Sequence, residues 1–256
     1  MKIATWNVNS LRVRLSHVLD WLDAEEPDLL ALQETKIQDD AFPVAEFAQR
    51  GYEAAFSGQP GYNGVALLAR GSLGEVRTEI DGFVDTQRRL LAGSFAGVRI
   101  IDVYVPNGQR VGSEKYRYKL EWLGALRAHL AAELRRYEYC AVLGDFNVAP
   151  EDRDVHDPAA WAGKVLCSEP ERAALAAVMD VGLADAFRLF DQPERAYSWW
   201  DYRVGAFRRN QGLRIDLILT SAALSRRCRA CRIDVAARGL ERPSDHAPVV
   251  AEFGEG

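Results

Sequence analysis

The sequence predicts a single α/β or α+β domain, residues 1–256, built from layers of strands and helices. Short apolar runs bounded by turn residues recur along the whole chain, which is the pattern of buried strands. Stretches with helical periodicity lie between some of these runs. Hydrophobic residues make up 48% of the 256 residues, enough for a chain of this length to bury a large core. We therefore expect sheets that are covered by helices.

Seven apolar runs predict the strands. Each run is short and has turn-type residues at its ends, which favours a strand in the interior of the molecule. In chain order the predicted strands are 2–6, 29–33, 64–69, 99–105, 139–144, 215–220 and 248–253.

Three stretches predict helices. The first begins after Ser10, the expected N-cap, and places its apolar residues on one face: Leu11, Leu15, Val18, Leu19 and Leu22. The second covers residues 114–137. The third opens with Ser-Glu-Pro-Glu at 168–171, a capping-box pattern, and continues to about residue 181. The segments 151–166 and 200–212 are predicted to be long loops, which are usually functional or disordered.

Composition narrows the class of protein. The 32 basic and 37 acidic residues give a net charge of −5, so a nucleic-acid partner would have to be held by a local basic patch. No apolar run approaches the roughly 20 residues of a membrane span. The first residues lack the apolar stretch of a secretory signal, and four scattered cysteines make no disulfide framework. We expect a reduced, cytoplasmic protein without a membrane partner.

Polar side chains follow several predicted strands at the point where each strand ends. They are Asn7 and Asn9, Glu34, Tyr104 and Asn107, and Asp145 and Asn147. Open sheets place their functional sites at strand ends, so these side chains predict a site there. The alternative is that the asparagines and aspartates only begin turns. An acidic residue such as Glu34 among them favours the site.

Asp216 lies inside an otherwise apolar strand, where a carboxylate must be paired or hydrogen-bonded. One candidate partner is Arg214. The other is a histidine, whose tautomer Asp216 would fix and whose pKa it would raise. His246, directly after Asp245, is the candidate histidine. Together with Glu34, these groups favour Mg²⁺ or Mn²⁺ over Zn²⁺, because hard cations prefer oxygen ligands.

The segment 199–203, Trp-Trp-Asp-Tyr-Arg, combines aromatic and charged residues. It predicts a loop that contacts phosphates and receives an unstacked nucleotide. The alternative is a core aromatic cluster with a solvated arginine face. Further basic groups come from Arg88 and its neighbours. Cys228 and Cys231 form one C-x-x-C without a second pair, so we expect no zinc site there.

In this order, the motifs resemble the exonuclease III family of DNA-repair nucleases, within the endonuclease-exonuclease-phosphatase superfamily. Gln-Glu-Thr-Lys at 33–36 and Trp-Trp-Asp-Tyr-Arg at 199–203 narrow the resemblance to the repair nucleases. The matching segments are 5–12, 32–36, 62–66, 103–108, 143–147, 198–203, 213–216 and 243–248. The resemblance implies a four-layer α/β sandwich, in which two packed mixed β-sheets are flanked by helices.

The resemblance also implies an activity. Members of the family use Mg²⁺ to hydrolyse phosphodiesters of duplex DNA in base excision repair. They cut 5′ to abasic sites, remove blocked 3′ ends such as 3′-phosphates, and degrade strands from 3′ ends. The implied partner is double-stranded DNA with such lesions. No exposed heptad or apolar stripe stands out in the sequence, so we expect a monomer, associated with the nucleoid. The alternative is a metal-dependent phosphoesterase of the same superfamily with a non-DNA substrate.

The resemblance also implies roles for the residues at the positions that match the family's motifs. Glu34 would bind the metal, with Asn9 and Asp245 nearby; some relatives carry aspartate where this chain has Asn9. Asp145 would orient and deprotonate the attacking water. Asn7 and Asn147 would hold Asp145 in place. His246, backed by Asp216, would donate a hydrogen bond to the scissile phosphate. Tyr104 and Asn107 would also contact that phosphate.

DNA contacts are also implied by position. Trp199, Trp200 and Leu213 would line the pocket for the flipped sugar, and Arg203 and Arg88 would contact the DNA. The loop at 151–168 varies in the family, so we expect it to affect the balance between abasic-site cleavage and 3′-end trimming.

Overall fold

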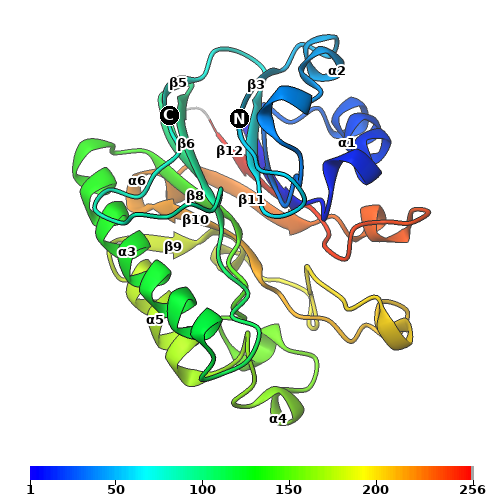
Figure 1. The fold of residues 1–256 in the computed structure, drawn as a ribbon, viewed down its shortest axis with the longest axis vertical. Coiled ribbons are helices and arrows are strands. Elements are labelled where there is room, and N and C mark those ends of the chain that lie inside the picture. The colour runs from blue at the N-terminus through cyan, green and yellow to red at the C-terminus, as the bar shows by residue number, and fades with distance from the viewer. Residues whose placement is uncertain (255–256) are drawn as a thin grey trace.

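The structure, a computed structural model, describes residues 1–254 and consists of two six-stranded sheets packed face to face (Figure 1). The strands of the first sheet are β1 (Lys2–Asn7), β2 (Leu29–Gln33), β3 (Glu53–Ser57), β4 (Val65–Ala69), β11 (Cys228–Ile233) and β12 (Val249–Phe253). The strands of the second are β5 (Gly74–Arg77), β6 (Leu90–Phe95), β7 (Val98–Tyr104), β8 (Cys140–Asp145), β9 (Leu183–Asp185) and β10 (Asp216–Ser221).

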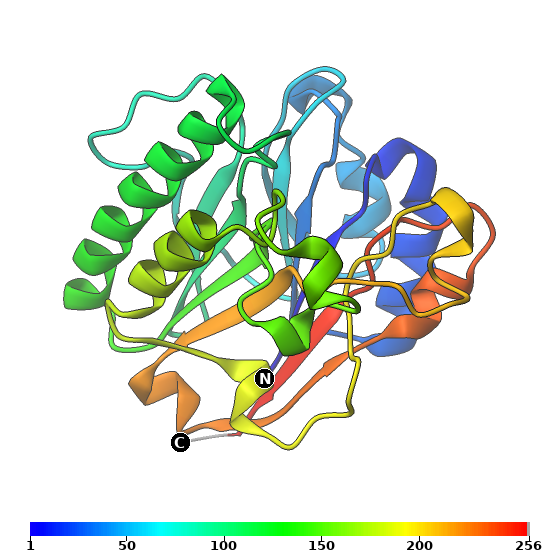
Figure 2. The same cartoon turned by 90° about the horizontal axis from the view of Figure 1, so that it is seen from below.

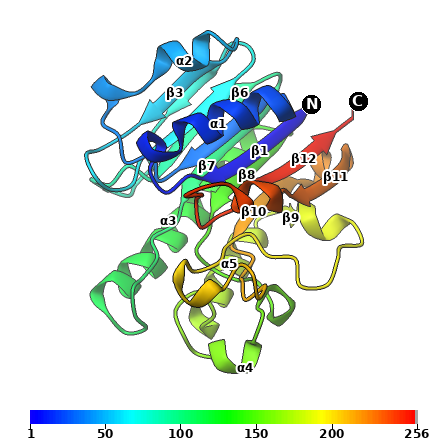
Figure 3. The ribbon, with the colours of Figure 1, turned by 90° about the vertical axis from the view of Figure 1, so that its right-hand side faces the viewer.

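Helices cover the outer face of each sheet, so the predicted four-layer sandwich is confirmed. α1 (Leu11–Glu25) and α2 (Val44–Ala48) lie on the first sheet, and α3 (Glu114–Arg136) and α5 (Glu169–Met179) on the second, as Figures 2 and 3 show. The short α4 (Pro158–Trp161) and α6 (Ala222–Ser225) lie outside these layers. Within the described residues, no helix is both long enough and apolar enough to cross a membrane.

Strand β1 shows why the apolar runs are nearly continuous. Successive side chains of a strand point to opposite faces. Ile3 therefore packs in the core between the sheets, whereas Ala4 and Trp6 pack in the core beneath α1. Because both faces of the strand are covered, both sets of positions must be apolar.

The two sheets repeat one strand arrangement. Their orders are β11-β12-β1-β2-β4-β3 and β5-β6-β7-β8-β10-β9. In each sheet a helical connection joins two parallel strands, β1–α1–β2 and β7–α3–β8. An antiparallel strand follows on the far side of each pair, β4 and β10 respectively. The ends of β1, β2, β7 and β8 that carry the predicted site residues meet at one edge of the sandwich.

All seven predicted strands form, with ends that shift by about one residue; for example, 139–144 becomes Cys140–Asp145. Strands β3, β5, β6, β9 and β11 were not predicted. β5 shows the reason, because it is an edge strand whose four residues are all exposed and carry no apolar pattern. The predicted loops 151–166 and 200–212 contain short 3₁₀ turns, and the first also contains α4.

The three predicted helices form, but Ser10 is not a side-chain cap. Its φ is 92°, and its side chain makes no capping hydrogen bond. Instead, the backbone N–H groups of Ser10 and Leu11 donate to the carbonyls of Glu34 and Thr35. The start of α1 is thus tied to the segment that follows β2. The predicted capping box of α5, between Ser168 and Glu171, is present.

Candidate active site

Carboxylates and amides from both sheets meet where β1, β2 and β8 end. Asn7 is the last residue of β1, and its Nδ2 donates to Glu34 Oε1 (2.9 Å) and to Asp145 Oδ2 (2.9 Å). Glu34 directly follows β2 of the first sheet, and Asp145 ends β8 of the second. One amide therefore joins the acidic groups of the two sheets.

The position of Asp145 depends on the residue before it. Gly144 has a φ of +143°, and a Cβ atom there would lie 1.9 Å from the carbonyl oxygen of Val103 on β7. Only glycine fits this close approach of the two strands. Asn147 then holds the carboxylate, because its backbone N donates to Asp145 Oδ1 (2.9 Å) and its Nδ2 to Oδ2 (3.1 Å).

His246 is the partner of Asp216. Its Nδ1 lies 3.0 Å and 2.9 Å from the two carboxylate oxygens of Asp216, and Ser198 Oγ donates to Asp216 Oδ2 (2.6 Å). The other ring nitrogen, Nε2, lies 3.8 Å from Asp145 Oδ2. The buried imidazole is therefore held between two carboxylates.

Arg214, the alternative partner of Asp216, belongs to another buried cluster. Its guanidinium lies 2.7 Å from both Asp154 and Asp185. This cluster attaches the loop at 151–166 to β10. It is an anchor for the loop rather than a part of the carboxylate site.

Burial and the neighbouring charges shift the pKa values of Asp145 and His246. Burial opposes ionisation and raises the pKa of Asp145 to about 7, although His246 acts against this. Burial also opposes the charge on His246, but Asp216 and Asp145 outweigh it and raise the pKa of His246 to about 10. Near neutral pH the ring is an imidazolium, which can donate a hydrogen bond from Nε2.

The site fits a hard divalent cation. Ligand atoms of Glu34, Asp145 and His246 all lie within 4.8 Å of one another. Next to them, Asn9 Nδ2 donates to Asp245 Oδ1 (2.9 Å). Burial opposes charge on Glu34, yet the pKa of Glu34 is lowered, because the ammonium of Lys36 and the amide of Asn7 favour the ionised form. Most of these donors are oxygens, which are the ligands that Mg²⁺ and Mn²⁺ prefer.

Lys36 was not singled out from the sequence beyond its place in the Gln-Glu-Thr-Lys motif. Its Nζ lies 2.9 Å from Glu34 Oε2 and 2.5 Å from Asn9 Oδ1. Arg14, for which the sequence carried no signal, donates to the backbone oxygen of Asn9 and to Tyr202 Oη (3.0 Å). Both cations therefore hold Asn9, one of the three predicted metal ligands.

Tyr104 ends β7 and pairs in register with Asp145. Burial and the nearby carboxylates of Glu34 and Asp145 raise the pKa of Tyr104 well above its usual value, so its hydroxyl stays protonated. The Arg89 guanidinium lies 4.6 Å from the ring centroid and donates to the Tyr104 carbonyl (3.1 Å). Its neighbour Arg88, the residue that the sequence singled out, is exposed.

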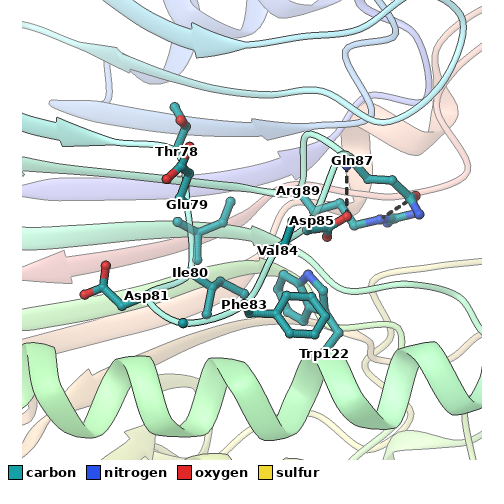
Figure 4. A pocket seen from close by; sticks show the side chains of 12 residues that line it. Thr78, Glu79, Ile80, Asp81, Phe83, Val84, Asp85, Gln87, Arg89 and Trp122 are labelled. Atoms are coloured by element: carbon teal, nitrogen blue, oxygen red, sulfur yellow. Dashed lines mark hydrogen bonds between the residues drawn. The ribbon is translucent and has the colours of Figure 1, made fainter.

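Two cavities have Arg89 in their lining, and Tyr104 lines one of them. One, of about 520 Å³, is lined by Tyr104, Asn107, Lys115 and other polar residues, and it opens beside the site. The other, of about 380 Å³, lies between the β5–β6 connection and α3, with Phe83 and Trp122 in its wall (Figure 4). Arg89 reaches both cavities, and Gln87 holds it through two hydrogen bonds of 3.0 and 2.9 Å.

The aromatic loop divides between surface and core. Trp199 is half-buried, and its Nε1 donates to Asp245 Oδ2 (3.0 Å). Trp200, which was predicted to line the pocket for the flipped sugar, is 1% exposed and packs on Phe207. Leu213 is 0% exposed and forms a floor beneath Trp199 rather than an accessible wall. Arg203 is exposed and pairs with Asp201 (2.6 Å).

A second tryptophan, which the sequence analysis missed, stands beside Trp199. Trp161 of α4 meets it edge to face, with ring centroids 6.5 Å apart. The two predicted long loops pack together beneath these rings through Val155, Leu166 and Leu213. Trp161 gave no signal because it lies in a segment without periodicity.

Two packed sheets with a carboxylate, amide and imidazolium site at one edge define the class of a metal-dependent phosphoesterase. The model of the Endonuclease/Exonuclease/phosphatase family matches residues 4–246, and the chain belongs to this family.

Within this family the chain is similar to DNA-repair nucleases, as the motifs predicted. Exodeoxyribonuclease III of Haemophilus influenzae is 34% identical over 99% of this chain and 100% of its own. A 3′ phosphatase from Neisseria, solved with a product DNA hairpin, is 44% identical with a TM-score of 0.98 over 100% of both chains. An AP endonuclease from Archaeoglobus fulgidus is 41% identical with a TM-score of 0.95, also over 100% of both chains.

Proposed function

We propose that this chain is an exodeoxyribonuclease III-type hydrolase that acts on double-stranded DNA with abasic sites or blocked 3′ ends. Its activities are 3′–5′ exonuclease, 3′-phosphatase and AP endonuclease in base excision repair. The chain works as a monomer on DNA at the nucleoid, in the cytoplasm. The observation that carries this proposal is the Asp145 carboxylate, held by two asparagines and facing the imidazolium of His246.

Glu34, with Asn9 and Asp245, would hold Mg²⁺, and Mn²⁺ is the alternative ion. A bound divalent cation supplies positive charge beside the phosphoryl oxygens and so stabilises the charge that builds there during in-line displacement. Asn9 is hydrogen-bonded to Asp245 and shares the ammonium of Lys36 with Glu34, which supports this set.

Asp145 orients the attacking water and accepts its proton. Asn7 and Asn147 fix the rotamer of this carboxylate, so that one oxygen stays directed at the water. A pKa of about 7 suits a group that must take up a proton near neutral pH.

His246 donates from Nε2 to a non-bridging oxygen of the phosphate. Asp216 bonds Nδ1, which sets the orientation of the ring and favours its charged form. The Tyr104 hydroxyl and the Asn107 amide donate to the same phosphate group. Donors fixed in place before the reaction stabilise developing charge without reorganisation.

DNA is held by the surfaces around the carboxylates. Trp199 and Trp161 offer aromatic faces to a sugar or base that leaves the helix. Arg203 and Arg88 contact backbone phosphates, and both are exposed. The DNA hairpin bound to the Neisseria relative supports DNA as the ligand of this surface.

Two labelled duplexes test this function. One carries an internal abasic-site analogue and the other a 3′-phosphate at a nick, and each is incubated with Mg²⁺ or with EDTA. We expect cleavage of both in Mg²⁺ and of neither in EDTA. Reaction at the 3′-phosphate alone would restrict the function to 3′-end cleaning. Failure on both duplexes would favour a phosphoesterase with a non-DNA substrate.

A further inference from the structure

A fully buried lysine lies behind the candidate site. Lys119 of α3 is 0% exposed, and its Nζ donates to the carbonyl oxygens of Asn107 (3.2 Å) and Asn147 (2.6 Å) and to the carboxylate of Glu171. An ammonium group has three N–H donors, so all of them are used. Two acceptors belong to the loops that follow β7 and β8, and the third belongs to α5.

Both loops carry side chains of the site. Asn107 Nδ2 donates to Asn147 Oδ1 (3.0 Å), and Asn147 Nδ2 donates to Asp145 Oδ2 (3.1 Å). Asn147 has a φ of +50°, in the left-handed region that few non-glycine residues adopt. Lys119 bonds the carbonyl of this same residue. A continuous series of hydrogen bonds therefore leads from the ammonium to Asp145.

The loop after β7 also packs tightly on the alkyl stem of the lysine. A Cβ atom at Gly108 would lie 3.1 Å from Lys119 Cδ. Glu171, the carboxylate partner of Lys119, also accepts hydrogen bonds from the backbone N–H groups of Leu166 (3.0 Å) and Ser168 (3.2 Å). Lys119 is thus the point where the two asparagine loops and the start of α5 are joined.

We propose that Lys119 is a positioning residue for the hydrolysis reaction. By bonding two loop carbonyls, it keeps Asn107 and Asn147 aligned with Asp145. The inference rests on the proposed function, because that function assigns the two asparagines to the phosphate and to Asp145. A buried ammonium needs three acceptors in any role, but two of those of Lys119 are carbonyls of the very residues, Asn107 and Asn147, that carry side chains of the site. Small displacements of such groups reduce the rate more than they reduce binding.

The chain contains a matched control. Arg99 of β7 and Glu133 of α3 form another buried ion pair (2.6 Å), with side chains 0% and 2% exposed. It joins α3 to β7 near the opposite end of the helix. Replacing both partners of either pair by neutral residues of similar size leaves no unpaired buried charge.

The experiment compares Lys119→Met/Glu171→Gln with Arg99→Met/Glu133→Gln. For each, the Tm, the affinity for lesion-bearing duplex in EDTA and the single-turnover cleavage rate in Mg²⁺ are measured. We expect both variants to lose Tm and to bind DNA as the wild type does. Only the Lys119 variant should cleave more slowly, by about 10- to 100-fold. Glu171→Gln alone, which retains the ammonium and its carbonyl acceptors, should cleave faster than that double variant.

Equal cleavage rates in the two double variants would overturn the inference. It would also be overturned if Glu171→Gln cleaved as slowly as Lys119→Met/Glu171→Gln. The wild-type rate separates this result from failure of the proposed function. Without wild-type cleavage, the proposed function fails and the inference falls with it. If the methionine variant does not fold, Lys119→Gln/Glu171→Gln takes its place, and a wild-type rate in it would contradict the positioning role.

Discussion

Buried carboxylates of this protein each need a hydrogen-bonding partner, and this need decides which residues lie next to them. Asp216 illustrates this, because a carboxylate inside an apolar strand requires a partner, and His246 supplies it. The same requirement applies to Asp102 of β7, which is 0% exposed between the sheets. Gln33 Nε2 donates to Asp102 Oδ1 (2.6 Å). Among the described residues, Asp102 Oδ2 and Gln33 Oε1 have no partner.

A protonated Asp102 would provide the donor that this pair lacks. Burial raises the pKa of Asp102 well above its usual 3.8. The folded state then binds this proton more tightly than the unfolded state, so Asp102 lowers the free energy of unfolding progressively as pH rises above 3.8. Asp102→Asn removes this titration. We predict that the variant gains stability relative to the wild type as pH increases, by roughly 1.4 kcal/mol per unit of pKa shift.

Urea denaturation of both proteins at about pH 5 and about pH 8 checks the prediction. Glu53→Gln, an exposed substitution on β3, is the control and should not change the pH dependence. Parallel pH dependences of wild type and Asp102→Asn would contradict a neutral Asp102.

Among the elements, the pair β7 and β8 carries the strictest constraint. A methyl group at Gly144 would meet the Val103 backbone at 1.9 Å, and Gly144 has a φ of +143°. We predict that Gly144→Ala costs about 2–4 kcal/mol and displaces Asp145, because backbone must move. Gly124, in α3 with no atom within 4 Å of an added Cβ, is the matched control. Gly124→Ala should stabilise the protein by about 0.5–1 kcal/mol in the same thermal unfolding assay. Equal effects of the two substitutions would contradict this account.

The aromatic loop contains two neighbouring tryptophans with different expected effects. Trp199→Ala removes a half-buried ring beside the site, so it should weaken DNA binding by about 1–3 kcal/mol with a small change in Tm. Trp200→Ala opens a cavity in the core and should cost about 3–5 kcal/mol of stability. Fluorescence anisotropy in EDTA and thermal unfolding separate the two. DNA affinity is measured at a temperature below the Tm of both variants. A larger loss of affinity in Trp200→Ala than in Trp199→Ala would contradict the assignment.

At the scale of the whole molecule, net charge and DNA binding are separate properties. The chain carries a net charge of −5, yet the proposed DNA surface includes the exposed Arg88 and Arg203. Counterions released from phosphates make affinity fall with salt, with a slope of about −0.9 per phosphate contacted. We predict a clearly negative slope of log K against log salt concentration. Affinity that does not change with salt would contradict binding through phosphates.

The buried strands were predictable because they leave continuous apolar runs, as in β1 and β8. The four-layer arrangement was predictable only through the resemblance of the site motifs to those of the repair nucleases. β5 was not, since an exposed edge strand needs no apolar residues. Within the site, the sequence indicated Asp145 and Glu34 by their positions at strand ends, and His246 as the candidate partner of the buried Asp216. It did not separate Trp199 from Trp200, or Arg89 from Arg88, because their burial depends on how distant segments pack.

The most direct test of the whole account is the metal-dependent cleavage of lesion-bearing duplex DNA by wild type and Asp145→Asn. Asparagine keeps the size of the side chain and cannot accept the proton of water. The account predicts that the variant binds the duplex in EDTA as wild type does, while its cleavage rate in Mg²⁺ falls by about 10²- to 10⁴-fold. Cleavage by the variant at the wild-type rate, or wild-type cleavage that persists in EDTA, would contradict it.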